Sequence, residues 1–599
     1  MAAPVEAAER AVLGVERSLT GKRWRSRLAD ERAAVALAQT LGIPEIVARV
    51  LAGRGIDAAQ AETYLNPTLR ALLPDPSRLI DMDAAAQRIV RAITAGETIG
   101  VLGDYDVDGA TASALIVRYL GALGRAVPVY IPDRMTEGYG PNPAGIAKLR
   151  QAGATLVITV DCGTTAFAPL EQATDGGLDI VVVDHHVAEP HLPRGCLVVN
   201  PNRADETATC GQLAAVGVAF LLVVAVNRAL RDAFWYGEGH PEPDLFAWLD
   251  LVALGTVCDV VPLTGVNRAL VAQGLKVMAQ RRNPGIAALA DVAHIDRRLD
   301  AWHTGFVLGP RVNAGGRVGE SGLGVRLLST DDPAEAQALA VRLDDYNRER
   351  QAIERLVLDA AMDQAERQAA DGLRIIFAAG EGWHPGVIGI VAGRLRERFD
   401  RPACVVALGG GVGKGSGRSV PGAALGAAVI AAHQAGLLVN GGGHAMAAGF
   451  TVEAAKLDAL RDFLGQQIDR ALGGAAPQPS IGLDGALEVA AATPELLALL
   501  ERLGPFGAGN ARPRFAVAQA RIVNVQPVGA DHVRCVLTGP DGTGRLKAIA
   551  FRAAGTPLGA ALLAARGAPL HLAGQLRLDD WQGRESAQLI IDDAARVEA

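Results

Sequence analysis

Gly103-Asp104-Tyr105-Asp106-Val107-Asp108-Gly109 stands at the end of a short apolar run, residues 99–103, and decides the fold of this 599-residue chain. The stretch puts three carboxylates at alternate positions just past a predicted strand. Neighbouring acids repel one another unless a cation compensates their charge. An EF-hand loop also begins with alternating acids, but it needs a glutamate at its twelfth position, which here is Leu115. The stretch therefore predicts a cation site of another type.

Short β-branched runs alternate with longer amphipathic stretches on the C-terminal side of this motif. The runs cover residues 99–103, 127–131, 155–160, 180–183 and 197–199. The alternation is typical of βαβ units and predicts a doubly wound parallel sheet. Sheets of this kind hold ligands beyond the carboxyl ends of their strands, so residues that follow different strands meet in space.

Further acids and histidines follow the later strands or nearby helical stretches. Asp161 follows the run 155–160, Asp184-His185-His186 follows the run 180–183, and Asp259 ends the segment 255–259. A lone aspartate or histidine is usually structural, but coincidence is a poor explanation for all of these clusters together. Oxygen ligands with a few imidazoles suit Mn²⁺ or Mg²⁺ better than zinc. Two such ions would bridge a phosphoryl group.

The remaining sequence predicts a long helix, a second α/β domain and a barrel. Asp332 is a good N-cap, and Pro333 opens a helical pattern that ends near Gly372. Strand-like runs at 373–378 and 403–408 bracket a helical stretch, and residues 473–480 resemble a linker. Four later runs predict a small β-barrel: 516–525, 532–537, 546–551 and 569–576.

Composition limits the class of protein. The longest apolar run, residues 213–226, is shorter than the roughly 20 residues that cross a bilayer, and it predicts a buried helix. Residues 1–28 lack the apolar core of a secretory signal, and the 6 cysteines are scattered without zinc or disulfide spacing. We expect a soluble cytoplasmic protein with no membrane partner. The formal charge of −7 disfavours non-specific nucleic-acid binding, but it leaves a local basic groove open.

The acidic motif 104–109, the strand-terminal Asp161, the Asp184-His185-His186 run and the later Asp259 resemble, in that order, the motifs of the DHH phosphoesterase superfamily. The resemblance implies that Asp161 bridges two ions and is catalytic, and that His186 contacts the scissile phosphate or transfers a proton. It implies five metal ligands: Asp106, Asp108, Asp161, His185 and Asp259.

Asp104 is counted with the catalytic residues, but the ligand set of the first metal site stays open. The inorganic pyrophosphatase branch of the superfamily carries a metal-binding histidine four positions before the first-motif aspartate. Here that position is Leu102. Asp104 is thus a candidate for either role.

Several later segments resemble the RecJ exonucleases within this superfamily: 132–139, 309–317 and 504–510. Gly413–Ser419 and Gly441–Phe450 resemble the DHH-associated domain, although each stretch alone could be a glycine-rich turn. The resemblance implies six substrate-binding residues: Arg134, Tyr139, Arg317, Ser416, Arg418 and His444. Of these, Arg134, Arg317, Ser416 and Arg418 would hold the 5′ end, and Tyr139 would stack on a base.

The expected fold class is α/β, with a DHH-type parallel-sheet domain, a connecting helix, a smaller DHH-associated α/β domain and a C-terminal OB-type β-barrel. The expected domains are a helical segment at 1–75, the catalytic domain at 76–330, the helix at 331–372, the DHH-associated domain at 373–472 and the barrel at 478–599. The resemblance implies a 5′-to-3′ exonuclease specific for single-stranded DNA, with two Mn²⁺ or Mg²⁺ ions and a role in recombination and repair. A helicase and single-strand-binding protein are expected partners of a monomer.

Two alternatives remain at this point. A DHH phosphodiesterase acting on cyclic dinucleotides would share the motifs, but a C-terminal barrel would be surplus for it. A non-catalytic DNA-binding relative would have lost metal ligands, whereas all of the expected ones are present here. Activity on a long strand compared with a dinucleotide would separate these alternatives from the exonuclease.

Overall fold

The computed structural model describes residues 11–473, 479–579 and 586–597. The chain divides into two compact units. Unit 1 combines residues 1–73, 262–272 and 478–599, and unit 2 combines residues 74–261 and 273–477. Most of the predicted linker at 473–480 lies outside the described residues. Within those residues, no helix has the length and apolar character needed to span a membrane.

Unit 2 contains the predicted parallel sheet. Its strands are β2 (Thr98–Gly103), β3 (Val129–Tyr130), β4 (Ala154–Val160), β5 (Asp179–Val183) and β6 (Leu197–Val199). They lie in the order β3-β2-β4-β5-β6, and every pair is parallel. The connection from β2 to β3 runs one way and the connection from β3 to β4 runs the other way, so the topology switches between β2 and β4. A ligand crevice is expected outside the carboxyl ends of these two strands.

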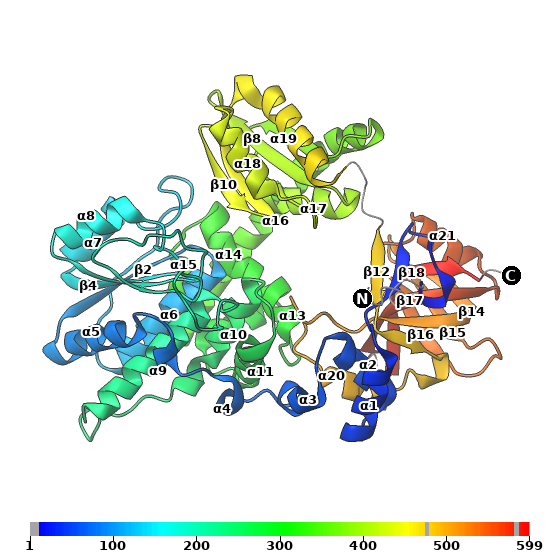
Figure 1. Ribbon diagram of the computed structural model, residues 1–599, viewed down its shortest axis with the longest axis horizontal. Helices are drawn as coiled ribbons and strands as arrows, with labels where there is room; N and C mark the ends of the chain where they lie inside the picture. Colours follow the sequence, from blue (N-terminus) through cyan, green and yellow to red (C-terminus); the bar gives the residue numbers. More distant parts are fainter. Residues whose placement is uncertain (1–10, 474–478, 580–585, 598–599) are drawn as a thin grey trace, which may run out of the picture. The chain divides into compact units, whose positions relative to one another are not determined.

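Helices cover both faces of this sheet (Figure 1). On one face lie α5 (Met82–Ala95), α6 (Val107–Ala122) and α9 (Ala215–Asp232), and on the other lie α7 (Pro143–Gln151) and α8 (Phe167–Asp175). The apolar run at 213–226 forms most of α9 and is buried along nearly its whole length, as predicted. Burial on all sides explains why residues 215–226 of this helix show no polar face.

A layer of shorter helices follows the sheet. Its members are η3 (Leu245–Trp248), α10 (Leu249–Cys258), α11 (Gly265–Met278), α12 (Pro284–Val292), α13 (Ala301–His303), η4 (Thr304–Leu308), α14 (Gly309–Val318) and α15 (Leu323–Ser329). Of these, η4 is a π-helical turn. Such turns are rare and are frequent at functional sites.

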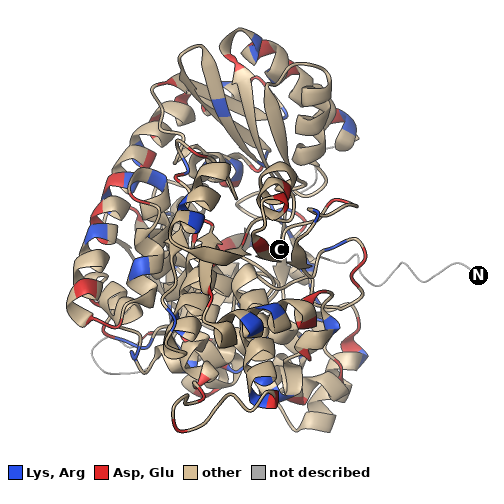
Figure 2. Cartoon of the chain, turned by 90° about the vertical axis from the view of Figure 1, so that its left-hand side faces the viewer, with Lys and Arg blue, Asp and Glu red and all other residues tan. Residues whose placement is uncertain are grey.

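The predicted long helix is α16 (Pro333–Ala370). It begins where the sequence indicates, because the Asp332 carboxylate accepts a hydrogen bond from the Ala334 amide at 2.9 Å and Pro333 occupies the first turn. Basic and acidic residues are interspersed over the helices of the chain (Figure 2). Mixed charge of this kind keeps exposed helical faces solvated.

A second sheet follows α16 within unit 2. Its strands are β7 (Ile376–Glu381), β8 (Ala403–Gly409), β9 (Val412–Arg418), β10 (Asn440–His444) and β11 (Ala447–Glu453), in the order β10-β11-β9-β8-β7. Its helices are α17 (Ile388–Phe399), α18 (Leu425–Gln434) and α19 (Leu457–Ala471). Side chains alternate along β7: Ile376 packs with α16 and α17, whereas Phe377 packs with α18 and α19. The two glycine-rich stretches form strands β9, β10 and β11, so they are more than turns.

Unit 1 contains the C-terminal barrel. Its strands are β13 (Gly485–Leu487), β14 (Phe515–Val528), β15 (His532–Thr538), β16 (Leu546–Ala550), β17 (Pro569–Asp579) and β18 (Ser586–Arg596). Pairing of β14 with both β15 and β17 closes the barrel. Two short helices also belong to this part: α20 (Pro494–Glu501) and α21 (Pro557–Ala564). The predicted OB-type architecture is confirmed, although β18 and the short β13 were not predicted from the sequence.

The N-terminal helices pack on this barrel within unit 1. They are α1 (Glu31–Leu41), α2 (Glu45–Gly53) and α3 (Ala58–Leu65); the short α4 (Leu69–Leu72) follows them in the chain. Buried Val47 and Leu51 of α2 share one apolar cluster with Leu497 of α20 and Phe515 of β14. Strand β1 (Arg23–Ser26) pairs in parallel with β12 (Ser480–Leu483). The N-terminal segment and the barrel thus share a core.

Candidate metal and nucleic-acid site

The first acidic motif lies in the turn from β2 into α6. Asp106 caps the helix, because its carboxylate accepts a hydrogen bond from the Gly109 amide at 3.0 Å. A Cβ atom at Gly109 would lie 2.6 Å from the Asp104 carbonyl oxygen, so this position requires glycine. The tight turn places Asp104 and Asp106 at the switch point of the sheet.

Asp108 is buried in the first turn of α6. Its two carboxylate oxygens accept hydrogen bonds from the Ala215 amide at 2.6 Å and the Val216 amide at 2.9 Å. These amides belong to the N-terminus of α9, whose partial positive charge stabilises an anion. The contact holds α6 and α9 together at the site.

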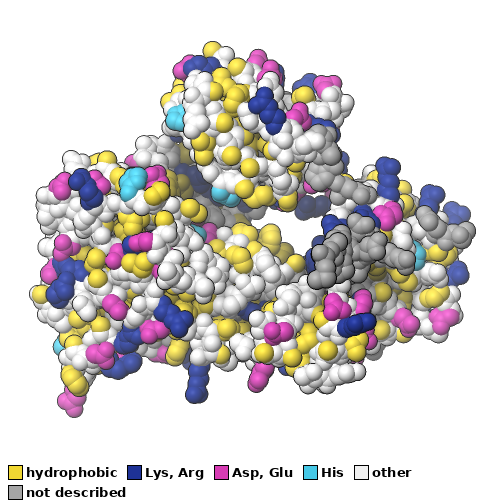
Figure 3. All heavy atoms as spheres, in the orientation of Figure 1, with side chains coloured by type: hydrophobic (Ala, Val, Ile, Leu, Met, Phe, Trp, Pro, Cys, Tyr) yellow, Lys and Arg dark blue, Asp and Glu magenta, His cyan; other side chains and the backbone are white. Residues whose placement is uncertain are grey.

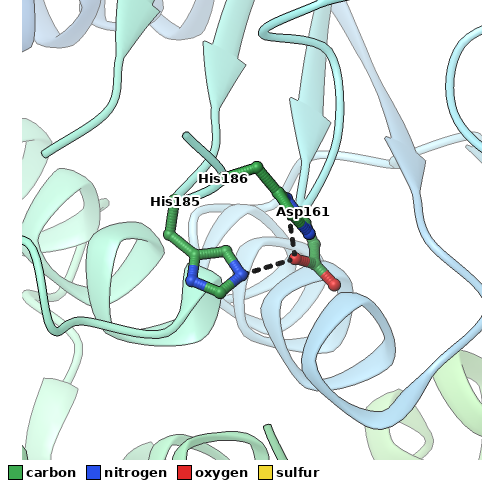
Figure 4. Close-up of side chains that lie close together, drawn as sticks. All are labelled: Asp161, His185 and His186. Atoms are coloured by element: carbon green, nitrogen blue, oxygen red, sulfur yellow. Dashed lines mark ion pairs between the residues drawn. The ribbon is translucent and has the colours of Figure 1, made fainter. Parts of the chain in front are cut away.

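Asp161 follows β4 with a backbone φ of 61°. Its amide donates to the Val183 carbonyl at 2.9 Å, which ties the residue to the end of β5. Its Oδ1 atom lies 3.3 Å from His185 Nε2 and 3.9 Å from His186 Nδ1 (Figure 4). Two adjacent strand ends thereby meet at a single carboxylate.

Asp184 orients the two histidines that follow it. Its Oδ1 atom accepts hydrogen bonds from the His185 amide at 2.8 Å and from His186 Nδ1 at 2.8 Å, and its Oδ2 atom accepts from the Thr164 amide at 3.0 Å. Burial opposes ionisation of Asp184, but the hydrogen bond and charge of His186 hold its pKa below the ordinary value. The same hydrogen bond outweighs burial and raises the pKa of His186 to about 9.

His185 presents Nε2 as a lone-pair donor. Its Nδ1 atom lies 3.1 Å from the Leu213 carbonyl oxygen, and a carbonyl can only accept, so Nδ1 carries the proton. Burial and the neighbouring His186 charge lower the pKa of His185 to about 4, which keeps the ring neutral. A neutral imidazole whose other nitrogen is fixed by a hydrogen bond is the usual form of a metal-binding histidine.

The carboxylates and imidazoles form three overlapping groups, each with ligand atoms within 4.8 Å of one another. The groups are Asp104, Asp106 and Asp161; Asp161, His185 and His186; and Asp108, His185 and Asp259. Four buried atoms that face these groups have no hydrogen-bond partner among the described residues: Asp104 Oδ1, Asp161 Oδ1, His185 Nε2 and Asp259 Oδ2. Converging lone pairs without donors fit divalent cations that favour oxygen and imidazole ligands.

The pKa values of the acids reflect repulsion between the neighbouring carboxylates. Burial and the Asp106 charge raise the pKa of Asp104 to about 8 and that of Asp259 to about 7. Burial and the other carboxylates also raise the pKa of Asp161 well above its ordinary value. A cation would reverse these shifts, because it compensates the charges that cause them.

Three arginines named by the sequence analysis also come together. Burial, followed by the charges of Arg134 and Arg350, lowers the pKa of Arg317 to about 10, and Arg418 adds to the effect. Burial and the charge of Arg134 lower the pKa of Arg418 as well. Among the described residues, Arg134, Arg317 and Arg418 form no ion pair with a carboxylate. Arginines that repel one another and form no ion pair can bind an anion.

The sheet of β9–β11 places the other substrate candidates. Ser416 Oγ lies 3.3 Å from Arg418 Nη1 on β9. His444 of β10 is opposite Ala447 of β11, which is opposite Arg418, so the three lie on one line across the sheet. Half-exposed Tyr139 lies at the metal groups, where its hydroxyl donates to the Asp161 carbonyl at 2.8 Å.

The sequence analysis missed the N-terminus of α17. A Cβ atom at Gly389, in its first turn, would lie 3.0 Å from Ser416 Oγ and 3.2 Å from an Arg418 guanidinium nitrogen. The first turn of α17 therefore lies close to Ser416 and Arg418, and a helix N-terminus favours an anion. The run His384-Pro385-Gly386 before α17 was the available signal, because it resembles a helix start.

Family models match most of the chain. The DHH family, N-terminal domain, matches residues 98–256, the DHHA1 domain matches residues 372–470, and the RecJ OB domain matches residues 483–593. These ranges correspond to the parallel sheet, the second sheet and the barrel.

Curated relatives and solved structures agree with these matches. The chain is 36% identical to the single-stranded-DNA-specific exonuclease RecJ of Escherichia coli, over 92% of this chain and 96% of the relative. It is 34% identical to the RecJ of Bacillus subtilis, over 96% of this chain and 71% of the relative. A crystal structure of Thermus thermophilus RecJ in complex with Mn²⁺ matches with a TM-score of 0.79 at 31% identity, covering 96% of this chain and 79% of that one. A Mg²⁺ complex of the same protein matches with a TM-score of 0.74 at 30% identity, covering 96% of this chain and 78% of that one.

Proposed function

The chain belongs to the RecJ family of single-stranded-DNA-specific exonucleases, and on that premise we propose that it removes nucleotides from the 5′ end of single-stranded DNA with two divalent cations. The activity itself, metal-dependent hydrolysis of single-stranded DNA, is that of the family. The observation that carries the proposal is the convergence of unpaired carboxylate oxygens and His185 Nε2 where β2, β4 and β5 end.

Mn²⁺ or Mg²⁺, which the solved relatives bind, would neutralise the phosphate and lower the pKa of an attacking water when bound. Asp104, Asp106 and Asp161 would hold one ion, and Asp108, His185 and Asp259 the other. Asp161 would be shared, because its Oδ1 atom lies 3.3 Å from His185 Nε2. This grouping gives Asp104 a role as a ligand.

His186 would contact the scissile phosphate. Half of its side chain is exposed, and the Asp184 carboxylate holds it in the charged form by raising its pKa to about 9. A charged imidazole can stabilise a phosphate oxygen and can give a proton to the leaving oxygen. Asp184 acts through His186 and is a positioning residue.

The arginine cluster supports the polarity of the proposed reaction. Arg134, Arg317 and Arg418 would bind the terminal 5′-phosphate together with Ser416 and the N-terminus of α17. His444 would contact the neighbouring backbone, and half-exposed Tyr139 would offer a stacking face to the terminal base. An anchored 5′ end would set which phosphodiester bond meets the metal groups.

The same family membership supports a cellular setting. We propose a monomeric cytoplasmic enzyme that acts in recombination and repair with a helicase and single-strand-binding protein. We also propose functional domains at residues 76–330 for catalysis, 373–472 for gripping the strand end and 478–599 for binding the strand. Residues 331–372 would connect the catalytic domain to the domain that grips the strand end, and residues 1–75 would pack against the strand-binding domain.

A degradation assay with labelled ends tests the proposal. Single strands labelled at the 5′ or the 3′ end, blunt duplexes and cyclic dinucleotides are incubated with Mn²⁺, Mg²⁺ or a chelator. We expect mononucleotide release from 5′-labelled single strands with either metal and none with the chelator. Release from the 3′ end would contradict the polarity, and preferential cleavage of cyclic dinucleotides would favour the other phosphodiesterase class.

A further inference from the structure

An exposed aromatic pair lies beside the metal groups in unit 2. Trp302 of α13 is 46% exposed and Phe306 of η4 is 72% exposed. Their rings stack with centroids 5.9 Å apart and planes inclined by 26°. Large aromatic side chains are normally buried, so two stacked rings open to solvent call for a ligand.

The turn that carries the pair packs against the helix that ends in a metal-ligand candidate. The Thr304 carbonyl accepts a hydrogen bond from Cys258 Sγ at 3.5 Å. A Cβ atom at Gly305 would lie 3.2 Å from Val257, and one at Gly309 would lie 2.4 Å from Cys258 Sγ. Val257 and Cys258 are the last residues of α10, and Asp259 follows directly. The aromatic pair is therefore tied to the edge of the metal centre.

Positive charge accompanies the aromatic rings. Arg297 Nε donates a hydrogen bond to His303 Nε2 at 3.2 Å, and His303 Nδ1 in turn lies 2.6 Å from the Asp300 carboxylate. These contacts hold the Arg297 guanidinium at His303, whose ring meets the Trp302 ring edge-on with centroids 5.3 Å apart. Arg297 and the adjacent Arg298 are exposed, and neither forms an ion pair within the described residues.

We infer that Trp302 and Phe306 form a stacking platform for unpaired bases of the DNA strand, with Arg297 and Arg298 binding its phosphates. Exposed aromatic faces next to unpaired arginines are the combination by which proteins bind single strands without sequence preference. Paired bases are stacked on each other, so a duplex has no free face for the platform. Hydrophobic side chains gather on several patches of the face in Figure 3, mixed with both charges; the arginines are what favour a nucleic acid over a protein as the occupant. The inference rests on the proposed function for its substrate.

Binding measured without metal tests the platform separately from catalysis. The variant Trp302→Leu/Phe306→Leu keeps apolar volume but removes both π-faces. Fluorescence anisotropy with a labelled oligo(dT) strand in chelator should show about 5- to 150-fold weaker binding for each base that loses its stack. Phe234→Leu is the matched control: Phe234 is 92% exposed but follows the C-terminus of α9, the opposite end from the amides that bind Asp108. Its affinity should equal that of the unaltered protein.

Two further measurements identify stacking and charge. A single abasic position moved along the strand should weaken binding by the unaltered protein at one or two positions, and the double-leucine variant should lose this position dependence. Arg297→Gln/Arg298→Gln should lower the slope of log affinity against log salt by about 1.4, since each single-strand phosphate contact contributes roughly 0.7. The leucine variant should leave that slope unchanged.

Two outcomes would overturn the inference, and a third would overturn only the proposed function. Unchanged affinity of a correctly folded double-leucine variant would exclude the platform. A dimer of the unaltered protein that dissociates in this variant, measured by light scattering, would make the patch a protein interface instead. If the unaltered protein failed to degrade single strands with Mn²⁺ but retained platform-dependent binding, the proposed function would fail and the platform would stand.

Discussion

Asp161 belongs to two of the three groups that could hold a cation, and its backbone conformation decides how its proposed bridging role can be tested. A φ of 61° is more costly for alanine than for asparagine. Asp161→Asn therefore removes the charge with little added strain. We expect kcat to fall by more than about 100-fold, since even residues that only orient a metal ligand cost roughly 10- to 100-fold. Stabilisation by Mn²⁺, measured as a rise in Tm, should also disappear.

Asp175→Asn is the control for that variant, because Asp175 is an exposed acid at the end of α8. It should keep both kcat and the Mn²⁺-dependent rise in Tm. An Asp161→Asn protein that retained more than a few per cent of kcat would show that Asp161 does not bridge the ions.

Arg418 is expected to act on binding rather than on chemistry. An interaction present equally in the ground and transition states lowers KM without raising kcat. Arg418→Ala should therefore raise KM by about 10- to 150-fold on 5′-phosphorylated strands, the value of a charge-assisted hydrogen bond. Steady-state kinetics on strands with a 5′-hydroxyl provide the control, and the effect there should be much smaller. An equal fall in kcat on both substrates would place Arg418 at the reacting phosphate.

At the scale of elements, the contact between α6 and α10 depends on a glycine. A Cβ atom at Gly255 would lie 2.2 Å from Thr111 Oγ1 and 3.0 Å from Asp108 Oδ1. Gly255→Ala should therefore lower the free energy of unfolding by about 1–3 kcal/mol, the usual cost of overpacking. Gly121→Ala in α6, where a Cβ atom meets nothing within 4 Å, should instead stabilise the protein by about 0.5–1 kcal/mol. Urea denaturation of both variants measures the difference, and equal shifts would contradict this packing.

Helix α10 also carries a buried acid away from the metal groups. Burial raises the pKa of Asp250 to about 6 from an ordinary 3.8. At low pH the carboxyl is protonated in both the folded and the unfolded protein, so it does not lower stability. As the pH rises above the unfolded pKa, the unfolded chain ionises more readily than the folded protein, and the free energy of unfolding falls. Asp250→Asn does not ionise, so its stability relative to the unaltered protein should increase between about pH 4 and 7, by roughly 3 kcal/mol in total.

Thermal denaturation in chelator across this pH range would measure the effect. The expected effect is a change in relative stability with pH, so a constant offset from imperfect packing of the amide leaves it intact. Asp175→Asn, at an exposed position at the end of α8, is the control. A flat difference for Asp250→Asn would mean that the carboxylate is solvated or paired in the folded protein.

At the scale of the whole molecule, α11 runs from unit 1 into unit 2, and Arg268 fixes its first half. This buried guanidinium donates to the Tyr64 carbonyl at 2.9 Å and the Leu503 carbonyl at 3.0 Å, and it stacks 3.9 Å from the Tyr64 ring centroid. Arg268→Met would remove the side-chain donor of the buried Tyr64 carbonyl, at about 1–3 kcal/mol, whereas the Leu503 carbonyl would keep its hydrogen bond from Asn510 Nδ2 at 3.0 Å. Calorimetry should show a lower Tm for unit 1, while the Mn²⁺-dependent transition of unit 2 stays unchanged.

Arg70→Met, at an exposed arginine of the same unit, should leave both transitions in place. If Arg268→Met shifted the Mn²⁺-dependent transition as much as the other, the two units would unfold together. Either result would show whether stability is shared through α11.

Local patterns were enough to predict the first sheet and the long helix. The strands around the acidic motif are short, buried and rich in β-branched residues, and Asp332-Pro333 marks the start of α16. The missed strand β18 has a different physical cause. Its sequence contains Asp593, whose carboxylate is buried and accepts hydrogen bonds from Trp24 Nε1 at 2.9 Å and Thr20 Oγ1 at 2.9 Å. An acid in a strand looks exposed until its distant partners are known.

The sequence by itself predicted a cation site, because strand-terminal acids and histidines of a parallel sheet must meet at one edge. The order of its motifs carried the resemblance to the family. Only the tertiary structure decided the orientation, the tautomer and the hydrogen-bond partners of these groups. The Leu213 carbonyl selects the His185 tautomer, the N-terminus of α9 binds Asp108, and Gly389 brings α17 to Ser416. Each of these depends on a hydrogen bond or a close approach between segments far apart in the chain, and such contacts have no periodicity or spacing that a sequence pattern can carry.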